Sequence, residues 1–572
     1  MLREVSADSS QFAQHRWFSR LSNPIFPIAA IVLAALVGIP LFWIFVYALS
    51  DASGAFSLAN IVKLVTDPAF RGPLATSLVV ASSVAVLCVG VSLPLAWLTS
   101  RTDMPLARMI RILVLACYVV PPFLGAIAWE LLAAPNKGFI NQAARSIFGM
   151  NQFDYVVNIY SVSGLIFVDT CYTFAFAFTL IATALDRVPN EYEEASAIFG
   201  ARRVPTLTRV TFPLIFPAII ASALVAFLHS ITLFGTPAIL ALPAGFHTLT
   251  TRIWSLFSYP TDEHLASAAA LPLLVITVCL LWMQARLIGR RSYTVVGGKN
   301  GRVAPMQLGR WRWPALVLSL AFLSLPIFLP LFALLRAAFT KDIGFASGIS
   351  DLTLDHFRFV FFSLSGMRQA FSNTIILGFV TATVGTAFGF IIAYIVNRKT
   401  VPGAGVIGFI AVAPSAIPSI VLAVGLFIAY TRPPLQLYGT LALLALAFVT
   451  LELPAAYQQM RAALRAMHPE LEDAGRIFGA SQLGAIRVIT APILRNSLIA
   501  TWCIVFVGAI RELSAAILLF TADTKVLSVF IYDLHESGQM GAIAVLGLVL
   551  LGMTIAIVAL ANKIGGANKV SG

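Results

Sequence analysis

The side chains best suited to chemistry in this sequence are ionisable residues that interrupt long apolar stretches. These residues are Glu130, Asp169, His229, Glu452, Arg511 and Glu512. A charge at the middle of a bilayer costs roughly 2.5–3.5 kcal/mol on insertion scales, so such groups face a polar path or one another. We predict a translocation path that includes Asp169, Glu452, Arg511 and Glu512. Interhelical pairing inside the bundle, with Arg511 and Glu512 neutralising one another, is an equally open alternative.

Motifs for catalysis or cofactor binding do not occur in the sequence. Gly298-Lys299 is followed by Asn300 and lacks the upstream glycine of a G-x-x-x-x-G-K-[ST] phosphate loop, so we expect no ATP binding by this chain. There is also no H-E-x-x-H, no G-x-S-x-G and no histidine cluster with metal spacing. We expect no catalytic residue, no metal site and no bound cofactor. His535, alone in a predicted external loop, is expected to be solvated.

Composition indicates which elements must hold these residues. The chain has 572 residues, of which 59% are hydrophobic and 11% charged, whereas soluble proteins carry roughly 25% charged residues. This composition excludes an ordinary soluble enzyme and makes lipid the main solvent. The net charge of +13 is assigned to cytoplasmic loops rather than to nucleic-acid binding. Five cysteines are scattered singly, so they indicate neither disulfides nor a metal site.

Twelve stretches are long enough for the roughly 20 apolar residues that a transmembrane helix needs. We predict spans near residues 25–48, 74–98, 110–132, 158–184, 213–235, 265–287, 314–336, 373–396, 404–429, 438–458, 492–513 and 540–562. With the N-terminus inside, the predicted cytoplasmic segments hold 26 of the 38 Lys and Arg residues. The positive-inside rule then places both termini in the cytoplasm. The predicted fold class is an all-α polytopic membrane protein.

An internal repeat divides the chain into two parallel six-helix halves. Residues 191–213 recur 279 positions later, and nine of the 23 positions are identical. A second match, 297 positions apart, pairs Arg101 with Arg398 and Pro121 with Pro418, and a longer external loop in the first half accounts for the shift. Six spans per repeat means that both halves enter the membrane in the same direction. We predict a first permease domain at 1–288, a cytoplasmic linker at 289–313 and a second permease domain at 314–572.

The duplicated segment lies between the fourth and fifth predicted spans of each half, on the predicted cytoplasmic side. Gly200 and Gly479 fall inside a helix-favouring pattern, where each would weaken a continuous helix by about 1 kcal/mol and indicates a bend. Pro213 and Pro492 are placed to begin the next span. A solvated connector would be free to vary in sequence and length, so the duplication favours a functional loop.

The two copies resemble a known signature. The first copy reads Glu194-Ala195-Ser196-x3-Gly200-x9-Val210-x-Phe212-Pro213. The second copy reads Asp473-Ala474-Gly475-x3-Gly479-x9-Ile489-x-Ala491-Pro492. Both are similar to the cytoplasmic E-A-A-x3-G-x9-I-x-L-P motif of ABC importer permeases, although Asp and Ala replace Glu and Leu in the second copy. The resemblance covers nearly the whole chain and implies the type I ABC importer permease fold.

The resemblance also implies partners and site residues. In that family the loop docks into a groove of the ATP-binding subunit and transmits closure of the ATPase dimer. The implied docking residues are Glu191, Glu194, Ala195, Gly200, Pro213, Glu470, Asp473, Ala474, Gly479 and Pro492. Implied partners are two copies of an ATP-binding subunit, which carry the ATP and Mg, and a periplasmic or lipid-anchored solute-binding protein. The implied location is the bacterial inner membrane.

The sequence leaves several alternatives for the identity of the transported ligand. Residues 234–240 and 511–518, together with Gly297-Gly298-Lys299, resemble the fused-permease branch that handles ferric iron. Related permeases carry thiamine, polyamines, phosphonates or sugar phosphates. A six-plus-six secondary transporter is a competing interpretation, although it gives no reason for a duplicated acidic loop. A membrane-embedded enzyme would need a cluster of catalytic residues, which the sequence lacks.

Overall fold

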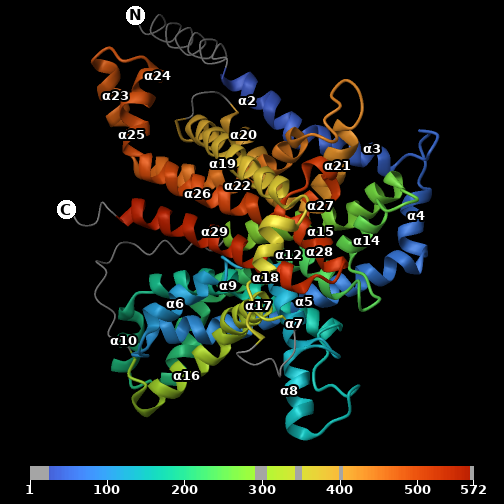
Figure 1. Ribbon diagram of the computed structural model, residues 1–572. Helices are drawn as coiled ribbons and strands as arrows, with labels where there is room; N and C mark the ends of the chain where they lie inside the picture. Colours follow the sequence, from blue (N-terminus) through green and yellow to red (C-terminus); the bar gives the residue numbers. More distant parts are fainter. Residues whose placement is uncertain (1–24, 202, 290–305, 342–350, 399–402, 567–572) are drawn as a thin grey trace, which may run out of the picture.

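The computed structural model describes residues 25–289 except 202, 306–341, 351–398 and 403–566. Every regular element in these ranges is a helix (Figure 1). The predicted all-α class is therefore confirmed. Most of the predicted linker, including Gly297-Gly298-Lys299, lies outside the described residues.

Nine continuous helical segments in the described ranges are long and apolar enough to cross a membrane. They are Pro27–Ala48 (α2, η1 and α3), Pro68–Arg101 (α5), Val162–Arg187 (α9), Leu207–Thr232 (η2 and α12), Glu263–Arg286 in α15, Gly309–Phe339 (η3, α16, η4 and α17), Met367–Arg398 (α19), Leu441–Ala466 (α22) and Met540–Ala561 in α29. All nine coincide with predicted spans.

The other three predicted spans are broken, which the sequence analysis did not foresee. The predicted span 110–132 consists of α6 (Ala107–Ala116) and α7 (Pro122–Ala133). The predicted span 404–429 consists of Ala404–Ala416 and Ser419–Tyr430 (α21), bent by 109°. Pro121 and Pro122 lie at the first break and Pro418 at the second. Proline lacks the backbone donor and clashes with the preceding turn, which explains both breaks.

The third broken span is the predicted helix 492–513, which joins the second duplicated loop. Here Gln482–Ile493 and Arg495–Arg511 (α26) meet at 76°. With this pair and the bent pair at Pro418, the described residues contain up to 11 candidate spans. Helices α6 and α7 are each too short to count as a span, so the described residues give nine to eleven candidate spans where twelve were predicted.

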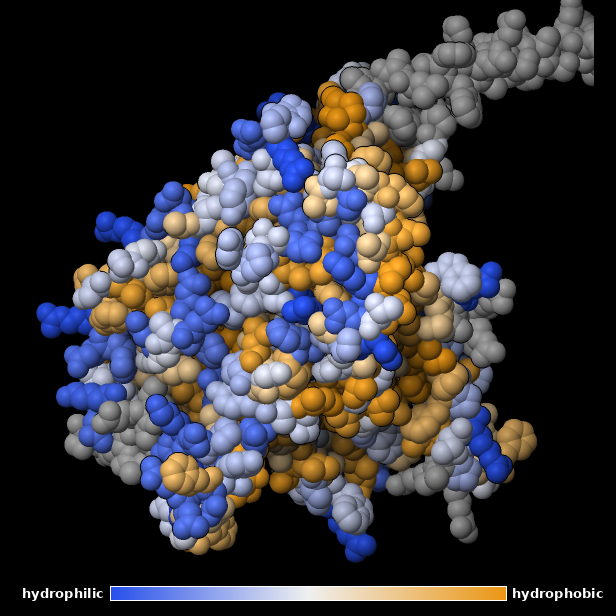
Figure 2. All heavy atoms as spheres, turned by 90° about the vertical axis from the view of Figure 1, so that its right-hand side faces the viewer, coloured by the Kyte–Doolittle hydropathy of each residue, from blue (hydrophilic) through white to orange (hydrophobic). Residues whose placement is uncertain are grey.

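Short helices fill the connections that lie away from the duplicated loops. They are α4 (Ala59–Thr66), α8 (Phe139–Phe148), α13 (Gly235–Leu240), α14 (Leu249–Ser255), α18 (Asp355–Arg358), α27 (Ala516–Leu519) and α28 (Leu527–Glu536). Helix α8 occupies the longer loop predicted for the first half. Figure 2 views the face that carries α4 and α14, where polar side chains gather beside an apolar flank.

Each half is held together by three long helices. In the first half α5 packs on α9 and α12, and in the second α19 packs on α22 and α26. The Oγ of Ser92 in α5 donates to the carbonyl oxygen of Phe174 in α9 at 2.9 Å. A Cβ at Gly389 in α19 would lie 2.8 Å from the Cβ of Ala456 in α22. Small residues and interhelical hydrogen bonds are what permits such close packing in lipid.

The first span of each half packs on its own half and also on the other half. Helix α3 (Ile39–Ala48) packs on α21 of the second half, and α17 (Leu329–Phe339) packs on α7 of the first. The hydroxyl of Tyr430 donates to the carbonyl oxygen of Ala35 at 2.7 Å. These contacts join the two repeats into one bundle.

Candidate functional site

The first duplicated segment folds as a short helical hairpin between α9 and α12. Helix α10 (Asn190–Ile198) is followed by α11 (Arg203–Thr206) and the π-helical turn η2 (Leu207–Thr211). Gly200 lies between the two helices with φ at +78°. The N–H of Ala201 donates to the carbonyl oxygen of Ser196 at 3.0 Å. This bond pattern and a left-handed glycine are typical of a helix terminus.

The second duplicated segment repeats this geometry. Helix α23 (Glu470–Ile477) is followed by α24 (Gln482–Ala485) and the π-helical turn η8 (Ile486–Thr490). Gly479 has φ at +89°, and the N–H of Ala480 donates to the carbonyl oxygen of Gly475 at 3.1 Å. Both glycines therefore end a helix, and the expectation that they lie within one was wrong. The predicted bend is present in both copies.

The prolines of the motif lie in the first turn of a helix, as expected, with a π-helical turn before each. Pro213 is in the first turn of α12 and Pro492 in that of α25 (Ala491–Ile493). A π-helical turn precedes each proline directly, so the helical path begins before it. A π-helical turn changes which backbone N–H groups donate hydrogen bonds within the helix. A proline, which has no N–H to donate, can therefore follow such a turn. Each proline thus lies in the first turn of an α-helix that directly follows a π-turn.

Exposure separates the outer face of each hairpin from its base. Glu191, Glu194, Ala195 and Gly200 are exposed in the first copy. Glu470, Asp473, Ala474 and Gly479 are exposed in the second. The tips carry the same apolar pair, because Ile198 and Phe199 are 83% and 89% exposed, and Ile477 and Phe478 are 84% and 91% exposed. Each hairpin therefore presents acidic residues beside an uncovered apolar tip.

The base of the second hairpin is held by a buried carboxylate that sequence reasoning missed. The Oε1 of Glu472 accepts hydrogen bonds from Nη2 of Arg398 at 3.0 Å and from Oγ1 of Thr490 at 2.9 Å. Its Oε2 accepts from Nε of Arg398 at 3.2 Å and from the hydroxyl of Tyr394 at 3.1 Å. Glu472 thereby joins the hairpin to the second span of its half and to the turn before the fifth.

The first hairpin uses the equivalent carboxylate, Glu193, whose Oε1 accepts from Oγ1 of Thr211 at 2.7 Å. Arg101, the repeat equivalent of Arg398, donates to the carbonyl oxygens of Leu185 and Val188, both at 2.6 Å. The signal for these residues was present, since Glu193/Glu472, Thr211/Thr490 and Arg101/Arg398 are identical across the repeat.

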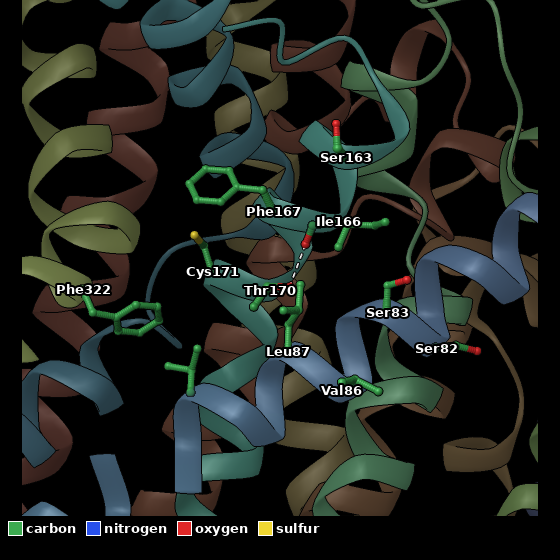
Figure 3. A pocket seen from close by; sticks show the side chains of 11 residues that line it. Ser82, Ser83, Val86, Leu87, Ser163, Ile166, Phe167, Thr170, Cys171 and Phe322 are labelled. Carbon is green, nitrogen blue, oxygen red and sulfur yellow. Dashed lines mark hydrogen bonds between the residues drawn. The ribbon is translucent and has the colours of Figure 1, made fainter. Parts of the chain in front are cut away.

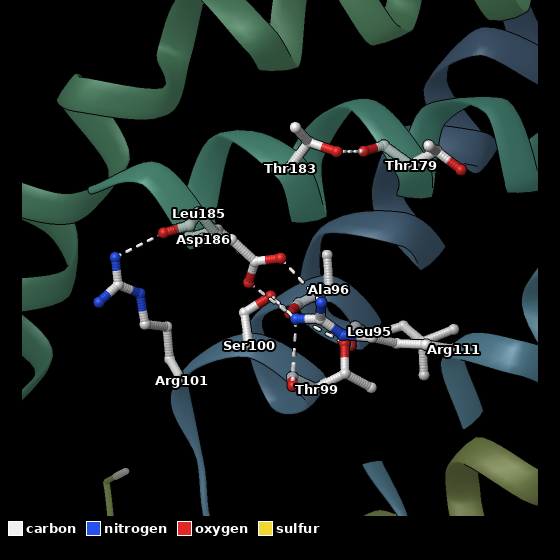
Figure 4. Close-up of polar contacts among 10 residues, drawn as sticks. All are labelled: Leu95, Ala96, Thr99, Ser100, Arg101, Arg111, Thr179, Thr183, Leu185 and Asp186. Carbon is white, nitrogen blue, oxygen red and sulfur yellow. Dashed lines mark hydrogen bonds and ion pairs between the residues drawn. The ribbon is translucent and has the colours of Figure 1, made fainter. Parts of the chain in front are cut away.

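A second ion pair braces the helix ends above the first hairpin (Figure 4). Nη1 of Arg111 in α6 lies 2.7 Å from Oδ2 of Asp186 in α9, and its Nη2 lies 2.8 Å from Oδ1. Nη2 also donates to Oγ of Ser100 at 2.6 Å. The second, third and fourth spans are thus tied together where the hairpin leaves the bundle.

The carboxylates proposed for the path face neighbouring helices of their own half. Asp169 in α9 is buried and its Oδ2 accepts from Oγ of Ser230 in α12 at 3.2 Å. The carboxylate of Glu452 in α22 lies against Gly508 of α26, where a Cβ would lie 2.2 Å from Oε1. Both contacts join a fourth span to a fifth span. This placement favours the interhelical alternative for these two residues.

Arg511 and Glu512 bond to other groups rather than to each other. Arg511 donates to the carbonyl oxygens of Tyr118 and Val120, which lie in the break between α6 and α7 of the other half. The Oε1 of Glu512 accepts from the N–H of Ala515 at 2.9 Å. The two side chains still attract one another as neighbouring opposite charges, and Arg511 in addition makes a contact between halves, in which it satisfies carbonyls that the broken span leaves free.

The prediction that the side chain of His535 is solvated was wrong. Its side chain is 9% exposed and its Nε2 lies 2.7 Å from Oε2 of Glu130, which is also 9% exposed. The solvated loop histidine that we expected is therefore buried against a carboxylate of the other half.

Two cavities are candidates for a small ligand. One, of about 730 Å³, is lined by helices α5 and α9 and by Phe322 of α16 (Figure 3). Its lining includes Val86, which is 71% exposed, so this cavity opens on the outside of the bundle. The other, of about 770 Å³, is lined by Glu130, Tyr160, Lys137 and Lys341 among others. It adjoins both halves and is the better placed for a translocated ligand.

Comparison with known families decides the class. The model of the binding-protein-dependent transport system inner membrane component matches residues 92–293 and again residues 385–564. The chain belongs to this family. Both matches contain a duplicated hairpin, and the chain is thus a fused, two-domain ABC importer permease. Membership in this family and the apolar spans together make it a multi-pass inner-membrane protein.

Several relatives of this permease are similar along most of its length. The ferric transport system permease protein FbpB of Actinobacillus pleuropneumoniae is 26% identical over 518 residues, which are 90% of this chain and 74% of the relative. The Fe(3+)-transport system permease protein FbpB 2 of Haemophilus influenzae is 24% identical over 526 residues, covering 90% and 94%. The molybdenum transport system permease protein ModB of Mycobacterium tuberculosis is 28% identical over 218 residues, covering 38% and 79%.

Proposed function

We propose that this permease moves ferric iron across the bacterial inner membrane, using ATP and Mg bound by a separate subunit. The observation that carries the coupling role is the pair of matching hairpins, each with an exposed Ile-Phe tip and a Glu-Thr hydrogen bond at its base. An exposed apolar patch with a polar rim is typical of a protein interface. Two such hairpins fit two copies of an ATP-binding subunit.

Relatives support the ferric ligand. The two ferric transport permeases cover 90% of this chain, whereas the molybdenum permease covers 38%. A periplasmic or lipid-anchored solute-binding protein would deliver the ligand to the side opposite the hairpins. Both termini would then lie in the cytoplasm, as the charge count predicts. Thiamine, polyamines, phosphonates and sugar phosphates stay as alternatives for the same machinery, and a six-plus-six secondary transporter is disfavoured by family membership.

Docking is tested by reversing charge on the exposed face of both hairpins. Glu194→Arg and Asp473→Arg each place a cation where an acidic residue is exposed, and repulsion plus unpaired groups weakens a complementary interface. Each single variant should reduce co-purification of the ATP-binding subunit, and the double variant should lose it. Stoichiometric co-purification and normal transport by the double variant would refute the docking role.

Ligand identity is tested in proteoliposomes that contain this chain, its ATP-binding subunit and its solute-binding protein. Radioactive iron should accumulate only with ATP and with the binding protein, and thiamine, putrescine and a phosphonate should not compete. Accumulation of one of these instead of iron would reassign the ligand while leaving the machinery in place. Iron accumulation driven by a proton gradient without the ATP-binding subunit would support the secondary-transporter alternative.

A further inference from the structure

One loop of the first half carries apolar side chains that the described part of the chain leaves uncovered. This α8 loop, residues 134–161, joins α7 to α9 and contains α8. Ile147 and Phe148 at the end of α8 are 71% and 73% exposed. Phe153 and Val156 on the returning chain are 80% and 60% exposed. We call these four side chains the apolar edge of the loop.

Hydrogen bonds inside the α8 loop hold this edge in place. Asn141 is buried, and its Oδ1 accepts from the N–H groups of Val156 and Val157 at 2.9 Å and 3.0 Å. Nδ2 of Asn141 donates to the carbonyl oxygen of Val157 at 2.7 Å. Nη1 of Arg145 donates to the carbonyl oxygen of Gln152, also at 2.7 Å. The returning chain is therefore fixed beside α8, and the edge is ordered before any partner binds, which lowers the entropic cost of binding.

The sequence of α8 separates polar from apolar positions. Residues three or four positions apart share one side of a helix, so Gln142 and Ser146 lie on one side of α8 and Ile140 and Ile147 on another. Residues 147–153 include no Asp, Glu, Lys or Arg. A helix with a polar side and an apolar, aromatic side is typical of a segment that lies in the interface of a bilayer.

The α8 loop begins and ends at the boundary of the membrane. The candidate span Val162–Arg187 begins directly after the loop. Val156 lies six positions before Val162, a stretch of at most about 22 Å even when fully extended. The apolar edge therefore lies close to the level at which α9 enters the bilayer.

The loop points sideways from the bundle. In Figure 1, α5 runs roughly from right to left, and α8 hangs from the lower edge of the bundle, across that direction. Helices α4 and α14 lie further to the right, at the end of the bundle. A protein that approaches along the membrane normal would meet α4 and α14, whereas the α8 loop faces the surrounding lipid.

We propose that the α8 loop is a membrane anchor, whose apolar edge inserts into the headgroup region of the adjacent leaflet. Aromatic side chains are enriched at this level of a bilayer. Tyr155, which is 52% exposed beside the edge, combines an apolar ring with a hydroxyl that can stay in water. The corresponding loop of the second half, residues 431–440 between α21 and α22, is much shorter, so the anchor belongs to the first half. This inference goes beyond the proposed transport function and does not depend on the ligand.

The test measures the depth of nitroxide labels on the full-length chain in nanodiscs of phosphatidylethanolamine and phosphatidylglycerol. Cys279, the exposed cysteine, is first replaced by serine. Labels on Ile147→Cys and Phe153→Cys should collide more often with oxygen, which concentrates in lipid, than with a water-soluble nickel chelate. Ser146→Cys is the matched control on the polar side of α8, and its label should show the reverse ratio.

A charged variant separates insertion from folding. Phe148→Asp combined with Val156→Asp leaves the hydrogen bonds of Asn141 and Arg145 in place, but carboxylates are costly within a bilayer. The label on Ile147→Cys should then shift to the ratio of a water-exposed site, while amide hydrogen exchange in α8 stays as in the parent protein.

Two results would overturn the anchor. One is a pair of labels on the unaltered edge that collide mainly with the nickel chelate, as the control does. The other is shielding of the label on Phe153→Cys from both collision partners when the solute-binding protein is added, which would assign the edge to that protein instead of lipid. Insertion that is the same with and without the solute-binding protein would support the anchor.

Discussion

The two hairpins present the same surface but are secured differently. In the second hairpin the carboxylate of Glu472 accepts hydrogen bonds from Arg398, Tyr394 and Thr490. In the first, Glu193 accepts from Thr211, while the equivalent arginine, Arg101, bonds to backbone carbonyls at the end of α9. Trp97 occupies the repeat position of Tyr394 and has no hydroxyl to offer.

The interiors of the hairpins differ as well. In the first, Oγ of Ser196 lies 2.9 Å from Oγ1 of Thr206, a polar contact between α10 and α11. The equivalent position in the second is Gly475, where a Cβ would lie 2.3 Å from Cδ1 of Ile489. The tip and its glycine are thus the same in both copies, whereas the contacts that support the hairpin differ. The second hairpin depends more on a buried charge pair.

The largest effect should come from proline at the shared glycines. Gly200 and Gly479 have φ at +78° and +89°, whereas proline fixes φ near −65°. Gly200→Pro or Gly479→Pro should therefore disrupt the hairpin and abolish ATP-driven transport, with the protein still inserted and abundant. Uptake in proteoliposomes and membrane yield are the measurements.

Gly54→Pro is the matched control for these variants, because Gly54 has φ at +83° in an exposed turn remote from the hairpins. It should leave transport near the wild-type rate. Equal loss of transport from all three variants would mean that the effect is general misfolding and not hairpin coupling.

The next largest effect should be a difference in stability between the two hairpins when the carboxylate at the base of each, Glu472 or Glu193, is removed. Glu472→Ala leaves Arg398, whose side chain is 12% exposed, without its carboxylate, and breaking a buried pair in this way costs roughly 3–5 kcal/mol. Glu193→Ala removes a hydrogen bond from Thr211, a loss of about 1 kcal/mol, and an attraction to Arg101 that water screens because Glu193 is only partly buried. Amide hydrogen exchange should therefore accelerate much more in the second hairpin of Glu472→Ala than in the first hairpin of Glu193→Ala.

Conservative variants sharpen this contrast. Glu472→Gln keeps the shape but loses the charge, and Tyr394→Phe removes one donor at 3.1 Å. Exchange should increase in the order Tyr394→Phe, Glu472→Gln, Glu472→Ala. Equal exchange in the Glu193→Ala and Glu472→Ala hairpins would show that the charge pair adds nothing to the second support.

The shared tip predicts equal effects in the two copies. Phe199→Asp and Phe478→Asp each remove an apolar side chain that is about 90% exposed in the free chain, at 89% and 91%. Burying a phenylalanine contributes roughly 1.5–3 kcal/mol, so each change should weaken binding of the ATP-binding subunit by about tenfold or more. Titration of the purified chain with that subunit measures this. A much larger loss for one tip would mean that only that hairpin docks.

Much of this fold was predictable because lipid imposes a simple length rule on apolar segments. Nine spans lie where hydropathy placed them, and the repeat located both hairpins. The breaks at Pro121 and Pro418 were not predicted, since proline within a membrane helix kinks some helices and breaks others, depending on which neighbours satisfy the free carbonyls. Arg511 is such a neighbour for the first break.

The site was less predictable than the fold. Exposed acidic residues of the hairpins followed from a local motif, and their docking role stays a prediction. The pairing of Glu130 with His535 spans 405 positions, and no local pattern encodes a contact between two halves. Glu193 and Glu472 were visible as identical repeat positions, but their hydrogen bonds to Thr211 and Thr490 depend on how the hairpin folds against the bundle, which periodicity does not specify.

The smallest effect concerns the interiors of the hairpins. Gly475→Ala adds a Cβ against the flexible end of Ile489, and the gain of about 1 kcal/mol from replacing a helical glycine offsets the cost of moving that side chain. Ser196→Ala removes the contact with Thr206 and should cost about 1 kcal/mol. Hydrogen exchange should therefore accelerate modestly in α10 of Ser196→Ala and change little in α23 of Gly475→Ala. If Gly475→Ala instead loosened its hairpin more than Ser196→Ala did, the close approach of Ile489 would be a required part of the second support and the two interiors would not be interchangeable solutions.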